Sequence, residues 1–137
     1  MQVNVLLVDD DAMNQWALGE ALTDAGHHVV PAATGDHAGE LMAQHPDLDI
    51  LVTDIALEGP VTGQQLARFW RSRSDRPTVY ITGFSPREAG IVSFDAKEAY
   101  LQKPFPAEEL VRIVERLVAA HRAAGQKLMG WRQPKAC

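Results

Sequence analysis

Residues 3–11 read Val-Asn-Val-Leu-Leu-Val-Asp-Asp-Asp, a short and nearly continuous apolar run that stops at three consecutive carboxylates. The apolar part is long enough for a strand and too short for a helix. A strand without alternating polar residues is typical of a parallel sheet that is covered by helices on both faces. The stretch therefore predicts an α/β fold with acidic side chains at the carboxyl end of its first strand.

Similar apolar runs alternate with helical patterns along the rest of the chain. Further strands are predicted over residues 28–30, 49–55, 78–81 and 99–102. Helices are predicted over residues 12–25, 34–44, 62–73 and from 106 to about 125. The third of these carries Leu66, Phe69 and Trp70 on its apolar face, and Gly125 is expected to end the last one. A helix is also expected within residues 85–98, but weak helix formers there predict that it is short or mobile.

Strands that alternate with helices imply right-handed βαβ units and a doubly wound, five-stranded parallel sheet. We expect one domain over residues 1–121 and a flexible tail over residues 122–137. In such sheets the functional site lies at the carboxyl ends of the strands.

The composition is that of one small globular domain: 137 residues, 46% of them apolar and 23% charged. A net charge of −5 without a basic stripe argues against direct nucleic-acid binding. A single cysteine, Cys137, excludes an internal disulfide and a cysteine-based zinc site. With no signal peptide and no apolar run of roughly 20 residues, we expect a cytoplasmic protein without a membrane partner. The histidines at 27, 28, 37, 45 and 121 lack ligand spacing, and we expect them in surface or loop positions.

Polar side chains follow four of the predicted strands. Asp9, Asp10 and Asp11 follow the first, Asp54 ends the third, Thr82 ends the fourth, and Lys103 follows the fifth. Each has a simpler interpretation: Asp10 or Asp11 can cap a helix, and the others can be ordinary turn, strand or loop residues. Their coincidence at one edge of the sheet favours a functional site.

The chemistry of such a site follows from its charges. Carboxylates held close together repel one another unless a cation lies among them, and hard oxygen ligands suit Mg²⁺. An aspartate can then attack phosphorus and form an aspartyl phosphate. A lysine ammonium and a hydroxyl group would stabilise the charge on the transferred group.

The chain resembles the receiver domains of two-component response regulators over roughly residues 3–121. The matching motifs are Val-Asp-Asp at 8–10, Thr-Asp-Ile at 53–55, Ile-Thr-Gly at 81–83 and Lys-Pro-Phe at 103–105. Ala33-Thr34-Gly35 and Gly63 also match. The resemblance implies the flavodoxin-like (βα)5 fold, with strand order 2-1-3-4-5.

The resemblance also implies a role for each site residue. Asp54 would accept the phosphoryl group, with slow autodephosphorylation and no further enzyme activity. The implied metal ion is Mg²⁺, and its expected protein ligands are Asp10 directly, Asp9 largely through water, Asp54, and the backbone carbonyl of Ala56. Lys103 would pair with Asp54 and then with the phosphoryl group, and its bond to Pro104 is often cis in this family. Thr82 and Tyr100 match the switch residues that move after phosphorylation.

The implied partners are proteins. A histidine kinase or a histidine phosphotransfer protein would donate the phosphoryl group and dock on Met13, Trp16, Pro104 and Phe105. A downstream protein would bind the surface of the fourth helix, fifth strand and fifth helix, and the receiver itself would be a monomer or a weak dimer. Since only about a dozen residues follow the last predicted helix, we expect a stand-alone receiver without a DNA-binding output domain.

The sequence departs from the common pattern at Ala56 and Phe84, which lie two residues after Asp54 and Thr82. Neither side chain can orient an attacking water, which predicts a long-lived aspartyl phosphate. Ala56 also argues against an Mg²⁺-dependent phosphatase, because such enzymes typically carry an aspartate there. A flavodoxin-like cofactor binder is disfavoured because Asp9 to Asp11 would repel phosphate. A degenerate receiver that acts only as a binding module is the remaining alternative.

Overall fold

The structure is a computed structural model, and it describes residues 1–90 and 95–132. Its elements in chain order are β1 (Asn4–Val8), α1 (Ala12–Asp24), β2 (His28–Ala32), α2 (Gly35–Gln44), β3 (Ile50–Asp54), α3 (Gly63–Arg73), β4 (Thr78–Thr82), β5 (Glu98–Gln102) and α4 (Ala107–Arg132). All neighbouring strands pair in parallel, in the order β2-β1-β3-β4-β5. This order and the flavodoxin-like architecture confirm the predicted fold.

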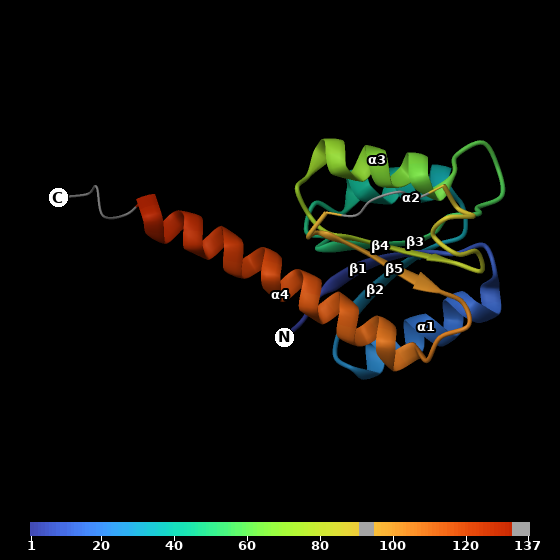
Figure 1. Ribbon diagram of the computed structural model, residues 1–137, viewed down its shortest axis with the longest axis horizontal. Coiled ribbons are helices and arrows are strands. Elements are labelled where there is room, and N and C mark those ends of the chain that lie inside the picture. The colour runs from blue at the N-terminus through green and yellow to red at the C-terminus, as the bar shows by residue number, and fades with distance from the viewer. Residues whose placement is uncertain (91–94, 133–137) are drawn as a thin grey trace.

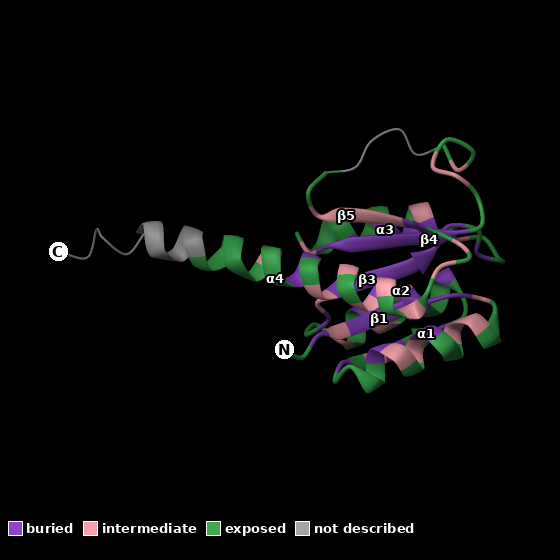
Figure 2. Ribbon diagram, turned by 60° about the horizontal axis from the view of Figure 1, so that its bottom comes forward, coloured by how far each residue is buried: buried purple, intermediate pink, exposed green. Residues whose placement is uncertain are grey.

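Helices cover both faces of the sheet: α1 and α4 lie on one side, and α2 and α3 on the other (Figure 1). Alternate residues of β1 therefore enter two different cores. Leu7 packs with Leu18 and Leu22 on the α1/α4 side, whereas Leu6 packs with Trp70 on the α2/α3 side. Burial on both faces, visible for the central strands in Figure 2, explains why β1 and β3 are apolar without alternation.

Side-chain caps define where the first three helices begin. The carboxylate of Asp11 accepts hydrogen bonds from the backbone N–H groups of Met13 and Asn14, and Thr34 caps α2 in the same way. Thr62 and Gln65 form a reciprocal capping box at the start of α3. Of the three consecutive aspartates, Asp11 is thus the helix cap, which leaves Asp9 and Asp10 for the site.

The helix expected between β4 and β5 is not found in the residues that the structure describes. Residues 83–90 and 95–97 form bends, turns and irregular backbone, while residues 91–94 of the predicted segment lie outside the described part. An ion pair links α3 directly to β5 here: Arg71 donates to Glu98 at 3.0 Å, and the Tyr80 hydroxyl donates to the same oxygen at 2.8 Å. Within the described residues the fold therefore has five strands and four helices, in the predicted flavodoxin-like arrangement.

The last helix is longer than predicted. It runs through residue 121 and through Gly125 to Arg132, and its C-terminal part extends beyond the sheet (Figure 1). One glycine costs a helix only about 1 kcal/mol, and the neighbouring Ala119, Ala120, Ala123 and Ala124 are the best helix formers. The predicted end near Gly125 was therefore wrong.

None of the helices in the described residues combines the length and the apolar character needed to cross a bilayer.

Phe69 was assigned to the wrong face of α3. The helix buries Leu66, Ala67 and Trp70 against the sheet, whereas Phe69 is 43% exposed. The guanidinium of Arg73 lies 5.5 Å from the centre of its ring. An i, i+3, i+4 pattern admits two neighbouring faces, and only packing decides between them.

His27 lies in the loop before β2, one of the two positions that the sequence predicted, but it is buried and not at the surface. Its Nδ1 accepts a hydrogen bond from the Val3 backbone at 3.1 Å, and its Nε2 lies 2.7 Å from a carboxylate oxygen of Glu115 on α4. Because Nδ1 is an acceptor, the proton lies on Nε2 and is donated to Glu115. His27 thus connects the start of β1 to the last helix.

We predict that His27→Ala lowers the free energy of unfolding by about 2 kcal/mol, because it leaves the buried Val3 N–H without an acceptor. His28→Ala, at the exposed neighbouring position, is the matched control and should change stability little. Urea denaturation of the three proteins measures the difference. Equal unfolding midpoints for both variants would show that the His27 contacts contribute nothing.

An acidic candidate site at the carboxyl edge of the sheet

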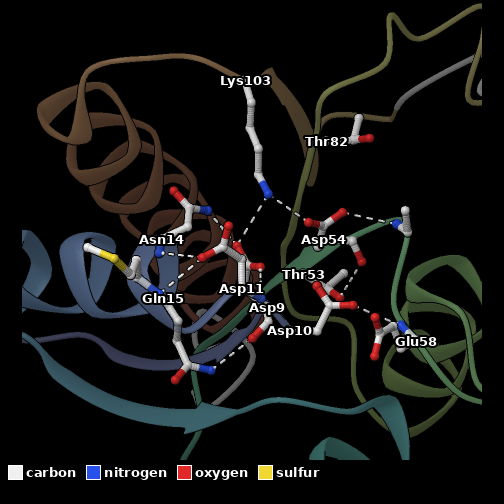
Figure 3. Close-up of polar contacts among 12 residues, drawn as sticks. Asp9, Asp10, Asp11, Asn14, Gln15, Thr53, Asp54, Glu58, Thr82 and Lys103 are labelled. Atoms are coloured by element: carbon white, nitrogen blue, oxygen red, sulfur yellow. Dashed lines mark hydrogen bonds and ion pairs between the residues drawn. The ribbon is translucent and has the colours of Figure 1, made fainter.

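Three carboxylates meet where β1 and β3 end, as Figure 3 shows. Asp9, Asp10 and Asp54 each offer one oxygen, and these oxygens lie within 4.8 Å of one another. Asp9 is fully buried, Asp54 is buried, and Asp10 is partly exposed. The parallel pairing of β1 with β3 brings the ends of these strands together, although Asp54 lies 44 and 45 residues from the other two.

Donors hold two of these carboxylates in place. Asp9 Oδ1 accepts from the backbone of Asp11 at 2.9 Å, and Asp9 Oδ2 accepts from the Asn14 amide at 2.5 Å. Asp10 Oδ2 accepts from the backbone N–H of Glu58 at 3.0 Å. Buried carboxylates need such partners, because an uncompensated charge in the interior is costly.

Asp54 has a donor on each oxygen. Its Oδ1 accepts from the backbone N–H of Ala56 at 3.0 Å, and its Oδ2 accepts from the Lys103 ammonium at 2.7 Å. The backbone of the following residue, Ile55, donates to Ile81 of the adjacent strand at 3.1 Å. The carboxylate is therefore presented from a rigid strand end.

Lys103 directly follows β5, at the carboxyl end of that strand, and its side chain reaches the site from there. Its backbone N–H donates to the Thr82 carbonyl at 2.7 Å, and the following bond to Pro104 is cis, as the family pattern predicted. Its ammonium lies 3.4 Å from Asp9 and 2.7 Å from Asp54. Burial disfavours the charge, but the hydrogen bond and charge of Asp54, assisted by Asp9, outweigh it and raise the pKa of Lys103 above its usual value.

The two predicted switch residues lie on neighbouring strands. Thr82 is buried at the end of β4, and its hydroxyl accepts from the Phe84 backbone at 3.3 Å. Tyr100 is half-buried against the α2/α3 core and pairs across the strands with Tyr80. Burial raises the pKa of the Tyr100 hydroxyl, and the charge of Glu88 adds to the effect.

The predicted docking residues flank this edge of the sheet. Met13 and Trp16 on α1 are 79% and 67% exposed. Pro104 is exposed, whereas Phe105 is half-buried and packs against the α1/α4 core. Three of the four are therefore accessible, and Phe105 contributes mainly to packing.

The sequence did not identify two amides on α1 as part of the site. Asn14 binds the Asp9 carboxylate, while Gln15 donates to the backbone carbonyls of Asp9 and Ala32 at 3.1 and 2.8 Å. Their position in the first turn after the Asp11 cap was the available signal, since that turn must pass close to the end of β1.

The donor set fits a hard divalent cation. Three carboxylates on a partly open edge suit a metal that prefers oxygen ligands. The group is therefore a candidate metal site, with Lys103 supplying positive charge beside it.

The family model of the response regulator receiver domain matches residues 5–115. The chain belongs to this family. Among solved structures, it is similar to a response regulator receiver protein from Sinorhizobium medicae, with 35% identity and a TM-score of 0.79, over 87% of this receiver and 96% of that chain. A receiver domain protein from Clostridium thermocellum shares the fold at 17% identity and a TM-score of 0.80, over 89% of this receiver and 98% of that chain.

Curated relatives extend beyond the matched region. The receiver is 30% identical to the regulatory protein VanRB of Enterococcus faecalis over 119 residues, which are 86% of this chain and 53% of that protein. It is 33% identical to the transcriptional regulatory protein TcrA of Mycobacterium tuberculosis over 109 residues, 79% of this chain and 43% of that protein. The chain thus spans about half the length of these relatives.

We predict that Gly63→Ala destabilises the site loop. An added Cβ would lie 2.0 Å from the Asp54 carbonyl oxygen and 2.8 Å from Ile55 Cα, and neither backbone atom can move away easily. We expect a loss of about 3 kcal/mol in the free energy of unfolding. Gly39→Ala on α2 is the control: its Cβ meets no atom within 4 Å, and it should be neutral or slightly stabilising. Equal denaturation midpoints for the two variants would contradict the close approach.

Proposed function

We propose that this receiver accepts a phosphoryl group from a phosphohistidine onto Asp54 and signals in a two-component or phosphorelay pathway. The observation that carries the proposal is the contact of Asp54 Oδ2 with the Lys103 ammonium at 2.7 Å, beside the buried Asp9 and the partly exposed Asp10. A phosphoryl acceptor needs a carboxylate that remains ionised and a cation that balances the transferred charge.

The transfer is a displacement at phosphorus. A carboxylate oxygen of Asp54 forms the new bond to phosphorus, and the bond between phosphorus and the donor's histidine nitrogen breaks, with its electron pair remaining on the nitrogen. Lys103 lies where it would stabilise the charge of the phosphoryl oxygens. Release of the phosphoryl group needs a separate attack by water on the aspartyl phosphate, and because neither Ala56 nor Phe84 can orient that water, we expect slow hydrolysis and no phosphatase turnover.

Asp9, Asp10 and Asp54 would hold Mg²⁺, with the backbone carbonyl of Ala56 as a further expected ligand. When bound, the ion would neutralise charge on the phosphoryl group, as metals do in phosphoryl transfer generally. The acidic cluster supports this choice because Mg²⁺ takes one or two carboxylates together with phosphate oxygens and water.

The added charge supplies a basis for switching. A phosphoryl group brings about −1.5 to −2 charge and strong acceptor oxygens to Asp54. We infer that the Thr82 hydroxyl turns toward these oxygens and that Tyr100 moves inward as space opens. Tyr100 is already half-buried on β5, so its movement would alter the surface of β5 and α4 that faces a downstream protein.

The phosphoryl donor would dock on α1. Exposed Met13 and Trp16 lie on this helix, and a groove between α1 and α4 has Ala21, Ala25 and Val111 in its lining. Helices carry the phosphorylated histidine in kinases and phosphotransfer proteins, and we infer that they pack against the first turns of α1, beside the acidic edge. Docking here would bring the histidine to the edge of the sheet where Asp54 lies.

We predict that acetyl phosphate with Mg²⁺ adds the mass of one phosphoryl group to the wild-type protein. Intact mass spectrometry should show that Asp54→Ala loses this gain, because the accepting carboxylate is gone. Asp47→Ala, an exposed aspartate away from the site, is the control and should keep it. A wild-type protein that gains no mass would refute the proposal and leave the degenerate receiver as the better interpretation.

We predict that the aspartyl phosphate persists well beyond seconds, because the exposed Ala56 and Phe84 cannot orient water. Ala56→Asp introduces a carboxylate beside Asp54 and should accelerate hydrolysis by about tenfold or more through general-base catalysis. Ala56→Leu is the matched control without a carboxylate. Decay of the phosphorylated species is followed by mass, and a wild-type half-life of seconds would contradict the prediction.

A further inference from the structure

Asn14 is the side chain on α1 that reaches the buried acid of the site. Its amide nitrogen lies 2.5 Å from Asp9 Oδ2. Figure 3 shows the two side chains together, that of Asn14 coming from α1 and that of Asp9 from the end of β1. Asp9 is 0% exposed, so solvent does not supply this oxygen with a donor. The Asn14 amide therefore supplies a hydrogen bond that the buried Asp9 carboxylate requires and that water does not provide.

The two oxygens of Asp9 are held in different ways. The backbone N–H of Asp11 fixes Oδ1 at 2.9 Å. On Oδ2 the Asn14 amide is the close donor, since Lys103 lies 3.4 Å away from it and only 2.7 Å from Asp54. Removing Asn14 would leave the Asp9 carboxylate with a close donor on one oxygen only, the Asp11 backbone N–H, so that it would turn more easily about its bond to Cβ or draw Lys103 away from Asp54.

We propose that Asn14 is a positioning residue for the metal site, which orients the Asp9 carboxylate so that Asp9, Asp10 and Asp54 present their oxygens together. An oxygen of a carboxylate has room for more than one donor, so the amide leaves Asp9 able to accept from a metal-bound water. The inference rests on the proposed function, because it deepens the assignment of the acidic cluster as the Mg²⁺ site.

The neighbouring amide, Gln15, has a different role. Its side chain donates to the backbone carbonyls of Asp9 and Ala32 and so ties the ends of β1 and β2 to α1. It holds the main chain and not the carboxylate. Within this pair of consecutive amides, only Asn14 contacts a group that would face the metal.

The test measures binding of Mg²⁺ to the unphosphorylated protein by isothermal titration calorimetry. Asn14→Leu keeps the size of the side chain and removes the donor, and we expect its dissociation constant to rise about tenfold, as is typical when a partner of a metal ligand is lost. Asn14→Gln retains an amide and should recover part of the affinity. Thr23→Ala, at the exposed far end of the same helix, should bind as the wild type does.

Thermal unfolding without metal, measured on the same proteins, separates positioning from a general effect on stability. A purely structural residue would lower the unfolding temperature of Asn14→Leu while leaving its Mg²⁺ affinity within twofold of wild type, and that result would overturn the inference. Tighter binding by Asn14→Leu would overturn it as well, since the amide would then compete with the metal. If the wild-type protein itself binds no Mg²⁺, the metal assignment in the proposed function fails first.

Discussion

The ion pair between Lys103 and the buried carboxylates is the interaction on which the rest of the site depends. Asp9 and Asp54 lie on neighbouring strands with little access to solvent, and two such charges repel strongly unless a cation compensates them. Lys103 contacts both of them from the end of β5. The arrangement links β1, β3 and β5 at one edge, so any change in charge at Asp54 acts directly on the last strand.

The two halves of this edge differ in rigidity. On the acidic side, β1 and β3 are buried on both faces, and Asp9 is held by Asp11 and Asn14. On the other side, β5 is only half-buried over most of its length, and the described residues between β4 and β5 form no helix. A fixed acceptor beside a weakly packed strand is a favourable arrangement for a switch, because elements with few buried contacts shift at low energetic cost.

Much of the site followed from the pattern of strand ends. Four apolar runs end in Asp9 and Asp10, Asp54, Thr82 and Lys103, and parallel pairing necessarily brings such ends to one edge. The contacts made from helices could not be foreseen in this way. The contact of Asn14 with Asp9 and the burial of His27 against Glu115 both depend on how α1 and α4 are placed over the sheet. The sequence leaves that placement open, because an apolar stripe shows which face of a helix is buried but not which segment of the chain that face packs against.

By itself, the sequence determined the five strands, four of the helices, the polar residues at the acidic edge and the resemblance to the receiver family. Local rules suffice for these, because hydrophobic period, caps and strand ends are properties of short segments. Tertiary structure alone decided that Phe69 faces solvent and that Arg71 and Glu98 link α3 to β5. Each of these depends on contacts between segments far apart in the chain, and the free energy of such contacts exceeds the small preferences that single residues carry.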